Sequence, residues 1–188
     1  MVHFGSLTMG LLTVAAFASA VPTPSGTADQ PGLEGIPVGS PDGIYIGSVK
    51  EDGRTQWEFL GDYNSTSTID SRSTGDGHAL AKRNGVSCNG FGVNADDANT
   101  AQGKLADMCG NGYYFSSKSI AQVSGGAVAF GCNYGNGQTC HKNDLWDFFG
   151  QINSVCGFTH GSSAGAGWYS RNDWKATYGR TSTGSGFC

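Results

Sequence analysis

The decisive stretch of the sequence is TCHKNDLWDFFGQINSVCG, residues 139–157. Its apolar side chains recur at three- and four-residue spacing, which is typical of a helix with one buried face. They are Leu145, Phe148, Phe149, Ile152, Val155 and Cys156. Polar residues at 139–143 can cap the start of this helix, and Gly157 stands where it should end. The stretch therefore predicts an amphipathic helix packed on a core.

A second helix is predicted upstream of this stretch. The apolar residues with helical spacing are Ala98, Ala101, Leu105 and Met108. Asp96 or Asp97 is expected to cap this helix, and Gly110 to end it.

Strand patterns surround the two helices. The candidates are residues 113–115, 119–123, 127–132, 168–170 and 174–178. In the last, Trp174, Ala176 and Tyr178 alternate with more polar residues, which suits a sheet with one solvent-facing side. The order helix, strands, helix, strands predicts an α+β fold. We expect a small disulfide-stapled α/β sandwich, with two helices packed on one face of an antiparallel sheet.

All six cysteines of the chain follow residue 87. They are Cys88, Cys109, Cys132, Cys140, Cys156 and Cys188. Six cysteines in a secreted domain predict three disulfides, whose pairing the sequence leaves open among about 15 arrangements. No close C-x-x-C pair suggests structural zinc, and we expect no metal or cofactor.

The N-terminus has the pattern of a signal peptide. Residues 7–17 are an apolar run, and Ala18-Ser19-Ala20 follows as a small-x-small cleavage site. The sequence therefore predicts a signal peptide at 1–20, cleaved after Ala20, and an extracellular product.

Residues 21–83 read as a pro-segment. They carry nine acidic and five basic residues and no cysteine, whereas residues 84–188 carry six of each charge. The dibasic pair Lys82-Arg83 lies where the composition changes, so we expect removal of 21–83 and a mature domain at 84–188. Residues 43–49 and 55–60 resemble a hairpin, which needs the domain for support or is loose. Asn64 begins a glycosylation sequon in the pro-segment.

Few residues of the mature domain suggest catalysis. Residues 84–188 contain no glutamate, so a two-carboxylate glycosidase would need aspartates alone. Residues 161–165 match G-x-S-x-G, but they lie in a Gly/Ser-rich run that predicts a flexible loop. His141 and His160 leave one enzymatic alternative, a small secreted hydrolase such as a ribonuclease. We expect a non-enzymatic protein with no catalytic residues.

Two hypotheses of a binding protein without catalysis remain, a carbohydrate-binding module and a toxin-like effector. A net charge near zero in 84–188 argues against a nucleic-acid partner. A cell-wall carbohydrate-binding module could use aromatic side chains, the candidates being Tyr113, Tyr114, Trp168 and Trp174.

Short motifs in 84–188 also resemble KP4-type fungal killer toxins. They are Asn84 to Gly90 after the dibasic pair, Leu105 to Asn111, Gly137 to Cys140, Val155 to Gly157 and the final Cys188. The resemblance implies an α/β sandwich and a secreted effector that acts on competing fungi or a host plant by interfering with calcium uptake. The chain has fewer cysteines than the founding toxin and lacks its basic surface.

The resemblance also sets the expected partners. It implies a monomer that binds a protein of the target-cell surface, such as a calcium channel, or a cell-wall component, without stable membrane insertion. Lys118 falls in the region where a target-binding lysine would lie.

Overall fold

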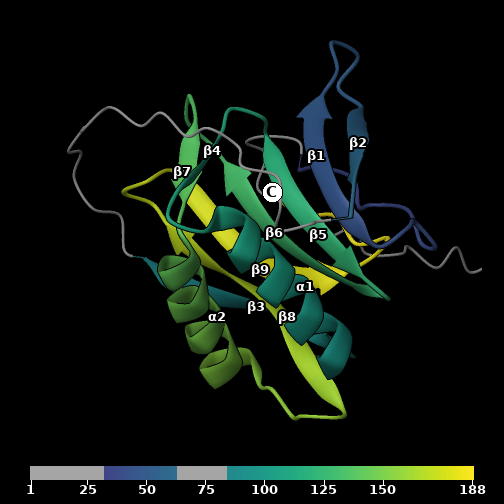
Figure 1. Ribbon diagram of the computed structural model, residues 1–188, viewed down its shortest axis with the longest axis vertical. Helices are drawn as coiled ribbons and strands as arrows, with labels where there is room; N and C mark the ends of the chain where they lie inside the picture. The colour runs from purple at the N-terminus through teal and green to yellow at the C-terminus, as the bar shows by residue number, and fades with distance from the viewer. Residues whose placement is uncertain (1–31, 63–83) are drawn as a thin grey trace, which may run out of the picture. The chain divides into compact units, whose positions relative to one another are not determined.

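The computed structural model of the chain describes residues 32–62 and 84–188. Within them, a large sheet and a small two-stranded sheet accompany two helices, α1 (Ala95–Cys109) and α2 (Lys142–Cys156) (Figure 1). The strands are β1 (Gly43–Val49), β2 (Thr55–Gly61), β3 (Gly85–Asn94), β4 (Tyr113–Phe115), β5 (Ser119–Ser124), β6 (Ala127–Asn133), β7 (Gln138–Cys140), β8 (Ser163–Arg171) and β9 (Ala176–Ser182).

The large sheet has seven strands in the order β2-β1-β5-β6-β9-β8-β3, and every neighbouring pair is antiparallel. Strands β4 and β7 pair separately. Both helices pack on one face of the large sheet (Figure 1), and the predicted α+β fold is thus confirmed.

The core under the helices follows the predicted patterns. Leu105 of α1 and Phe149 of α2 are buried against Ile120 of β5 and Tyr178 of β9. Burial of these apolar side chains is the main favourable contribution to packing of the helices on the sheet.

The opposite face of the sheet is also buried, which the prediction of a solvent-facing side missed. Residues 176–181 of β9 are all buried. On this face Val128 and Phe130 of β6 contact Ile36 and Phe187, from segments at the two ends of the described chain. We call residues 183–188, which follow β9, the C-terminal tail.

Residues 32–62, here called segment 32–62, belong to the same compact unit as residues 84–188. The hairpin expected in this segment is present: β1 and β2 flank a turn at residues 50–54, and β1 pairs with β5. Composition predicted order only in 84–188, because a cysteine-free, glycine-rich stretch shows no sign of a pairing partner that lies far along the chain.

Local signals at the helix ends were partly misread. Asn94, and not Asp96 or Asp97, caps α1: its Oδ1 accepts hydrogen bonds from the amides of both aspartates, at 2.9 and 3.0 Å. The aspartates lie in the first turn, where negative charge favours the helix. Gly110 and Gly157 end the two helices as predicted.

Two strand boundaries also differ from the prediction. Trp174 lies in the turn between β8 and β9, and β9 begins only at Ala176, because Lys175 has a left-handed φ of 52°. The G-x-S-x-G run is only partly loop, since Ser163 opens β8 opposite Asn94. Strand β3 was not predicted at all.

The six cysteines form three disulfides, as expected. The pairs are Cys88–Cys156, Cys109–Cys140 and Cys132–Cys188. They close loops of 68, 31 and 56 residues, and each contributes about 4 kcal/mol to the unfolding free energy in the chain-entropy model. The third pair holds the C-terminal tail on β6.

The end of α2 is fixed to the sheet by Arg180, which is fully buried. Its guanidinium donates hydrogen bonds to the carbonyl oxygens of Gly165 and Gly157, at 2.8 and 3.1 Å, and to the side chain of Asn153. Burial lowers the pKa of Arg180 to about 10. Its positive charge lies at a helix C-terminus, which favours it.

Candidate ligand-binding pocket

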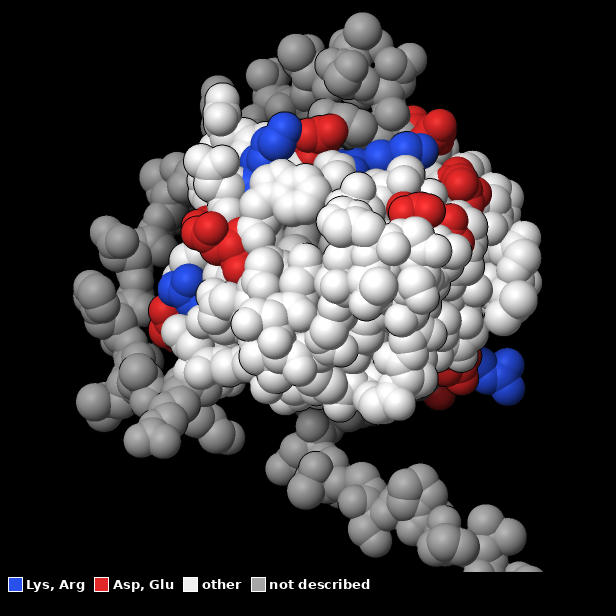
Figure 2. All heavy atoms as spheres, turned by 90° about the horizontal axis from the view of Figure 1, so that it is seen from below, with Lys and Arg blue, Asp and Glu red and all other residues white. Residues whose placement is uncertain are grey.

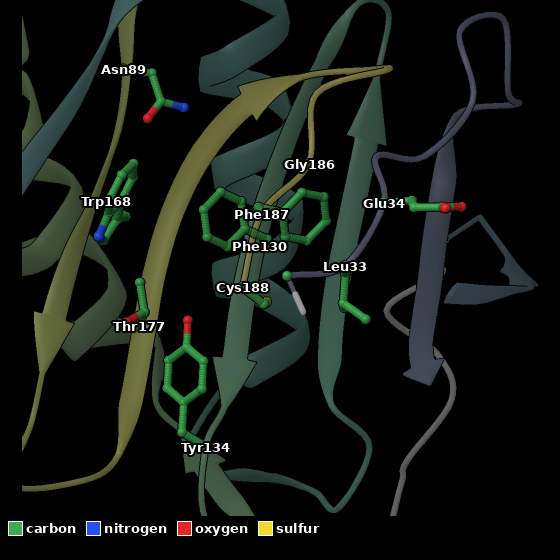
Figure 3. Close-up of a pocket in the computed structure, with 11 residues that line it drawn as sticks. Leu33, Glu34, Asn89, Phe130, Tyr134, Trp168, Thr177, Gly186, Phe187 and Cys188 are labelled. Carbon is green, nitrogen blue, oxygen red and sulfur yellow. The ribbon is translucent and has the colours of Figure 1, made fainter. Parts of the chain in front are cut away.

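A pocket of about 400 Å³ lies on the sheet face opposite the helices (Figure 3). We call it the aromatic pocket. Its walls come from strands β3, β6, β8 and β9, from Tyr134 just after β6, from residues 32–34 and from the C-terminal tail. The main lining side chains are Leu33, Phe130, Tyr134, Trp168, Thr177 and Phe187. This size and this largely apolar lining are typical of small-molecule sites.

Two phenylalanines form the centre of the pocket. The rings of Phe130 and Phe187 stack with centroids 4.4 Å apart, and Trp57 tilts against Phe187 at 5.3 Å. Phe187 precedes Cys188, whose disulfide to Cys132 holds the tail over β6. The covalent bond therefore fixes an aromatic wall in place before any ligand arrives.

Polar side chains also line the pocket, among them Glu34, Asn89, Tyr134 and Thr177. Burial raises the pKa of the Tyr134 hydroxyl, and the neighbouring Thr177 side chain has a smaller, opposite effect. The ammonium of Lys118 lies 4.6 Å from the centre of the Tyr134 ring, within cation–π range. Partial burial lowers the pKa of Lys118. These groups can orient a ligand whose apolar part enters the pocket.

Residues 32–34 form the remaining wall and are held from two sides. The backbone of Leu33 exchanges two hydrogen bonds with Phe187, at 2.9 and 3.1 Å. The indole of Trp57 donates to the carbonyl of Glu34 at 3.0 Å, and the amide of Glu34 donates to Thr55 at 2.8 Å. Segment 32–62 is thus part of the site.

The two histidines of the hydrolase hypothesis are not brought together. His141 precedes α2 and its Nδ1 lies 2.9 Å from the carbonyl oxygen of Asn111, whereas His160 follows α2 and contacts the edge of Phe158. The 15 residues of α2 span roughly 22 Å. One imidazole cannot act as base while the other acts as acid on the same small substrate.

The four aromatic residues of the carbohydrate hypothesis do not share a surface. Trp168 lines the aromatic pocket. Trp174 packs on the helix side of the sheet, with the Arg171 guanidinium 3.6 Å from its ring centre. Tyr113 and Tyr114 belong to β4 of the small sheet. Only Trp168 therefore keeps a place in a binding site.

Several predicted site residues lie outside the described residues. They are Ala20, Asn64, Lys82 and Arg83. Lys118 is described and lies beside the aromatic pocket through its contact with Tyr134.

Most of the residues that line the pocket carry no signal in the sequence. Phe130 precedes Cys132 by two residues on β6, and Phe187 precedes Cys188, so the disulfide partners carry the two rings to the same place. With the pairing known, these neighbours would have indicated the pocket. With 15 pairings open, they could not.

Charges on the visible face in Figure 2 are of both signs, and Lys and Arg do not gather there into a separate patch. Among the described residues, no group of three or more His, Cys, Asp or Glu is placed to hold a metal ion. None of the helices in 32–62 and 84–188 is long and apolar enough to span a membrane.

Comparisons of the chain with models of protein families, with curated proteins and with solved structures found no match.

Proposed function

We propose that the chain is a secreted, non-enzymatic effector of the killer-toxin kind. It acts on the surface of competing fungal or host plant cells, where it interferes with calcium uptake, and it recognises its target through the aromatic pocket. The signal-peptide pattern and the motifs shared with KP4-type toxins support secretion and this class of activity. Three disulfides suit an oxidising, extracellular environment.

The observation that carries the proposal is the aromatic pocket. Phe130 and Phe187 offer apolar contact, while Thr177, Tyr134 and the nearby Lys118 offer polar contacts. Such a site suits a partner that presents an apolar group next to an acceptor or a negative charge. A surface protein or a cell-wall component can both present one.

The test applies the purified secreted protein to fungal and plant cells while growth and calcium uptake are recorded. Trp168→Ala removes a pocket wall, and we expect at least a tenfold loss of potency. Trp146→Ala is the matched control, because Trp146 is 40% exposed on α2, away from the pocket. Near-ultraviolet circular dichroism and thermal unfolding verify that both variants fold.

Three results would count against the proposal. The first is a wild-type protein without effect on any cell tested, and the second is equal potency of the two tryptophan variants. The third is a loss of activity in the double variant His141→Ala, His160→Ala while it remains folded, which would favour the hydrolase alternative. We expect this variant to keep full potency.

A further inference from the structure

Segment 32–62 has no covalent connection to residues 84–188 except through residues 63–83. It contains no cysteine, and all three disulfides join residues after position 87. A cut at the predicted Lys82-Arg83 site would therefore turn the folded unit into two polypeptides. Whether they separate depends on the non-covalent contacts between them.

Backbone pairing between the two parts is extensive. Strand β1 pairs with β5 over five residues, from Gly43 opposite Val123 to Gly47 opposite Ser119. On the aromatic-pocket side, Leu33 pairs with Phe187, and Gly184 donates to the carbonyl of Ile36 at 2.6 Å. Segment 32–62 is thus bound at two separate places.

Side-chain burial reinforces the pairing. Leu33, Ile36 and Tyr45 are 1%, 0% and 4% exposed, and Ile36 and Tyr45 belong to the same buried cluster as Phe130 and Phe187. Polar contacts lie at the margins: Asp42 accepts a hydrogen bond from the amide of Gly125 at 2.8 Å. The interface therefore has a buried apolar centre and a polar rim, as stable protein interfaces do.

Residues 84–188 would be poorly covered by themselves. All six residues of β5 are buried in the structure, and without β1 this strand would become an open edge of the sheet. An open, apolar edge strand is a template for aggregation. Loss of Ile36 and Leu33 would also uncover Phe130 and remove one wall of the aromatic pocket.

We propose that segment 32–62 remains bound after the chain is cut within residues 63–83, so that the processed protein is a non-covalent complex of two chains. The retained chain supplies strands β1 and β2 of the large sheet and one wall of the aromatic pocket. This inference does not depend on the proposed function, because it concerns only which polypeptides remain together.

The test uses the full chain, with a recognition sequence for a site-specific protease placed within residues 63–83. After cleavage with the disulfides intact, size-exclusion chromatography and native mass spectrometry are expected to show both polypeptides in one complex. The same sample in denaturant should separate into two. Elution of residues 84–188 without segment 32–62, whether folded or aggregated, would overturn the proposal.

A matched pair of variants identifies the contacts responsible. Ile36→Ser removes a fully buried contact and is expected to speed dissociation of the cut complex at least tenfold. Val38→Ser is the control, because Val38 is 79% exposed, and it should dissociate at the wild-type rate. Equal rates for the two variants would contradict the proposed interface.

If Ile36→Ser does not fold, hydrogen exchange on the cut wild-type protein replaces it. The β5 amides that bond β1 should stay as protected as in the uncut chain. Complete loss of their protection after cleavage would show that segment 32–62 has left.

Discussion

Arg171 and Asp173 make the best-defined ion pair among the described residues. The guanidinium donates to both carboxylate oxygens, at 2.9 and 2.7 Å, while its plane lies over the ring of Trp174. The hydrogen bond from Arg171 lowers the pKa of Asp173 from 3.8 to about 2. The last two residues of this turn, Trp174 and Lys175, were predicted to begin a strand, because Trp174 continues the alternation of Ala176 and Tyr178.

The Asp173 pKa predicts a particular acid sensitivity. Because the folded value is below the unfolded one, the pair stabilises the fold above about pH 4, and this contribution is lost as the pH falls toward 2. The carboxylate is about one-third exposed, so we expect only about 1 kcal/mol after solvent screening. In Asp173→Asn, unfolding free energies measured by urea titration should fall less steeply over this range.

The control for this prediction is Asp52→Asn, which removes an exposed carboxylate 3.9 Å from Arg54. It should keep the wild-type acid profile. A wild-type profile in Asp173→Asn as well would show that the pair adds no stability.

At the scale of elements, the contact between α2 and β8 depends on a missing side chain. A Cβ at Gly165 would lie 1.9 Å from the carbonyl oxygen of Cys156, and the Gly165 carbonyl also accepts the hydrogen bond from Arg180. The end of α2 can therefore approach the sheet only where the strand has glycine.

Gly165→Ala is expected to destabilise the protein by about 1 to 3 kcal/mol, because the backbone of α2 must move to relieve the overlap. Gly85→Ala is the matched control: it lies in β3 with no atom within 4 Å of the added Cβ. Its effect should be neutral or slightly stabilising, since alanine restricts the unfolded chain. Equal urea midpoints for both variants would refute the close contact.

Elements with strong local signals could be predicted from the sequence. The apolar stripes of α1 and α2, and the β1–β2 hairpin with its turn, carry their own patterns. Strand β3 carries no such pattern, because apolar and polar residues do not alternate along GVSCNGFGVN. This strand is held in the sheet by its pairing with β8 and by the Cys88–Cys156 bond. The cap by Asn94 was missed because two aspartates follow directly and offer the same chemistry.

At the scale of the whole molecule, the described residues should unfold as one cooperative unit. Unfolding enthalpy grows in proportion to the number of ordered residues, so segment 32–62 should add almost a third to the enthalpy of residues 84–188 alone. Scanning calorimetry of the full chain should give a single transition that includes this addition. Two transitions, or the enthalpy of residues 84–188 alone, would show that segment 32–62 unfolds separately.

The part of the core on the sheet face opposite the helices, here called the second layer, could not be predicted from the sequence. It joins Ile36, Phe130 and Phe187, which are far apart along the chain and are brought together by strand order and by one of 15 cysteine pairings. The aromatic pocket belongs to this layer. Of its lining, Trp168 and the disulfide cysteine Cys188 were singled out from the sequence, with Lys118 named just outside it.

The pairing of β1 with β5 has a consequence for biosynthesis. Gly43 is translated well before its partner Val123, and at ordinary rates of chain elongation β1, paired at first only with β2, waits several seconds for its second neighbour. During that time the other edge of β1 stays unpaired and its apolar side chains stay uncovered, open to chaperones or to a wrong partner. The first strand made therefore remains an open edge until almost two thirds of the chain have been synthesised.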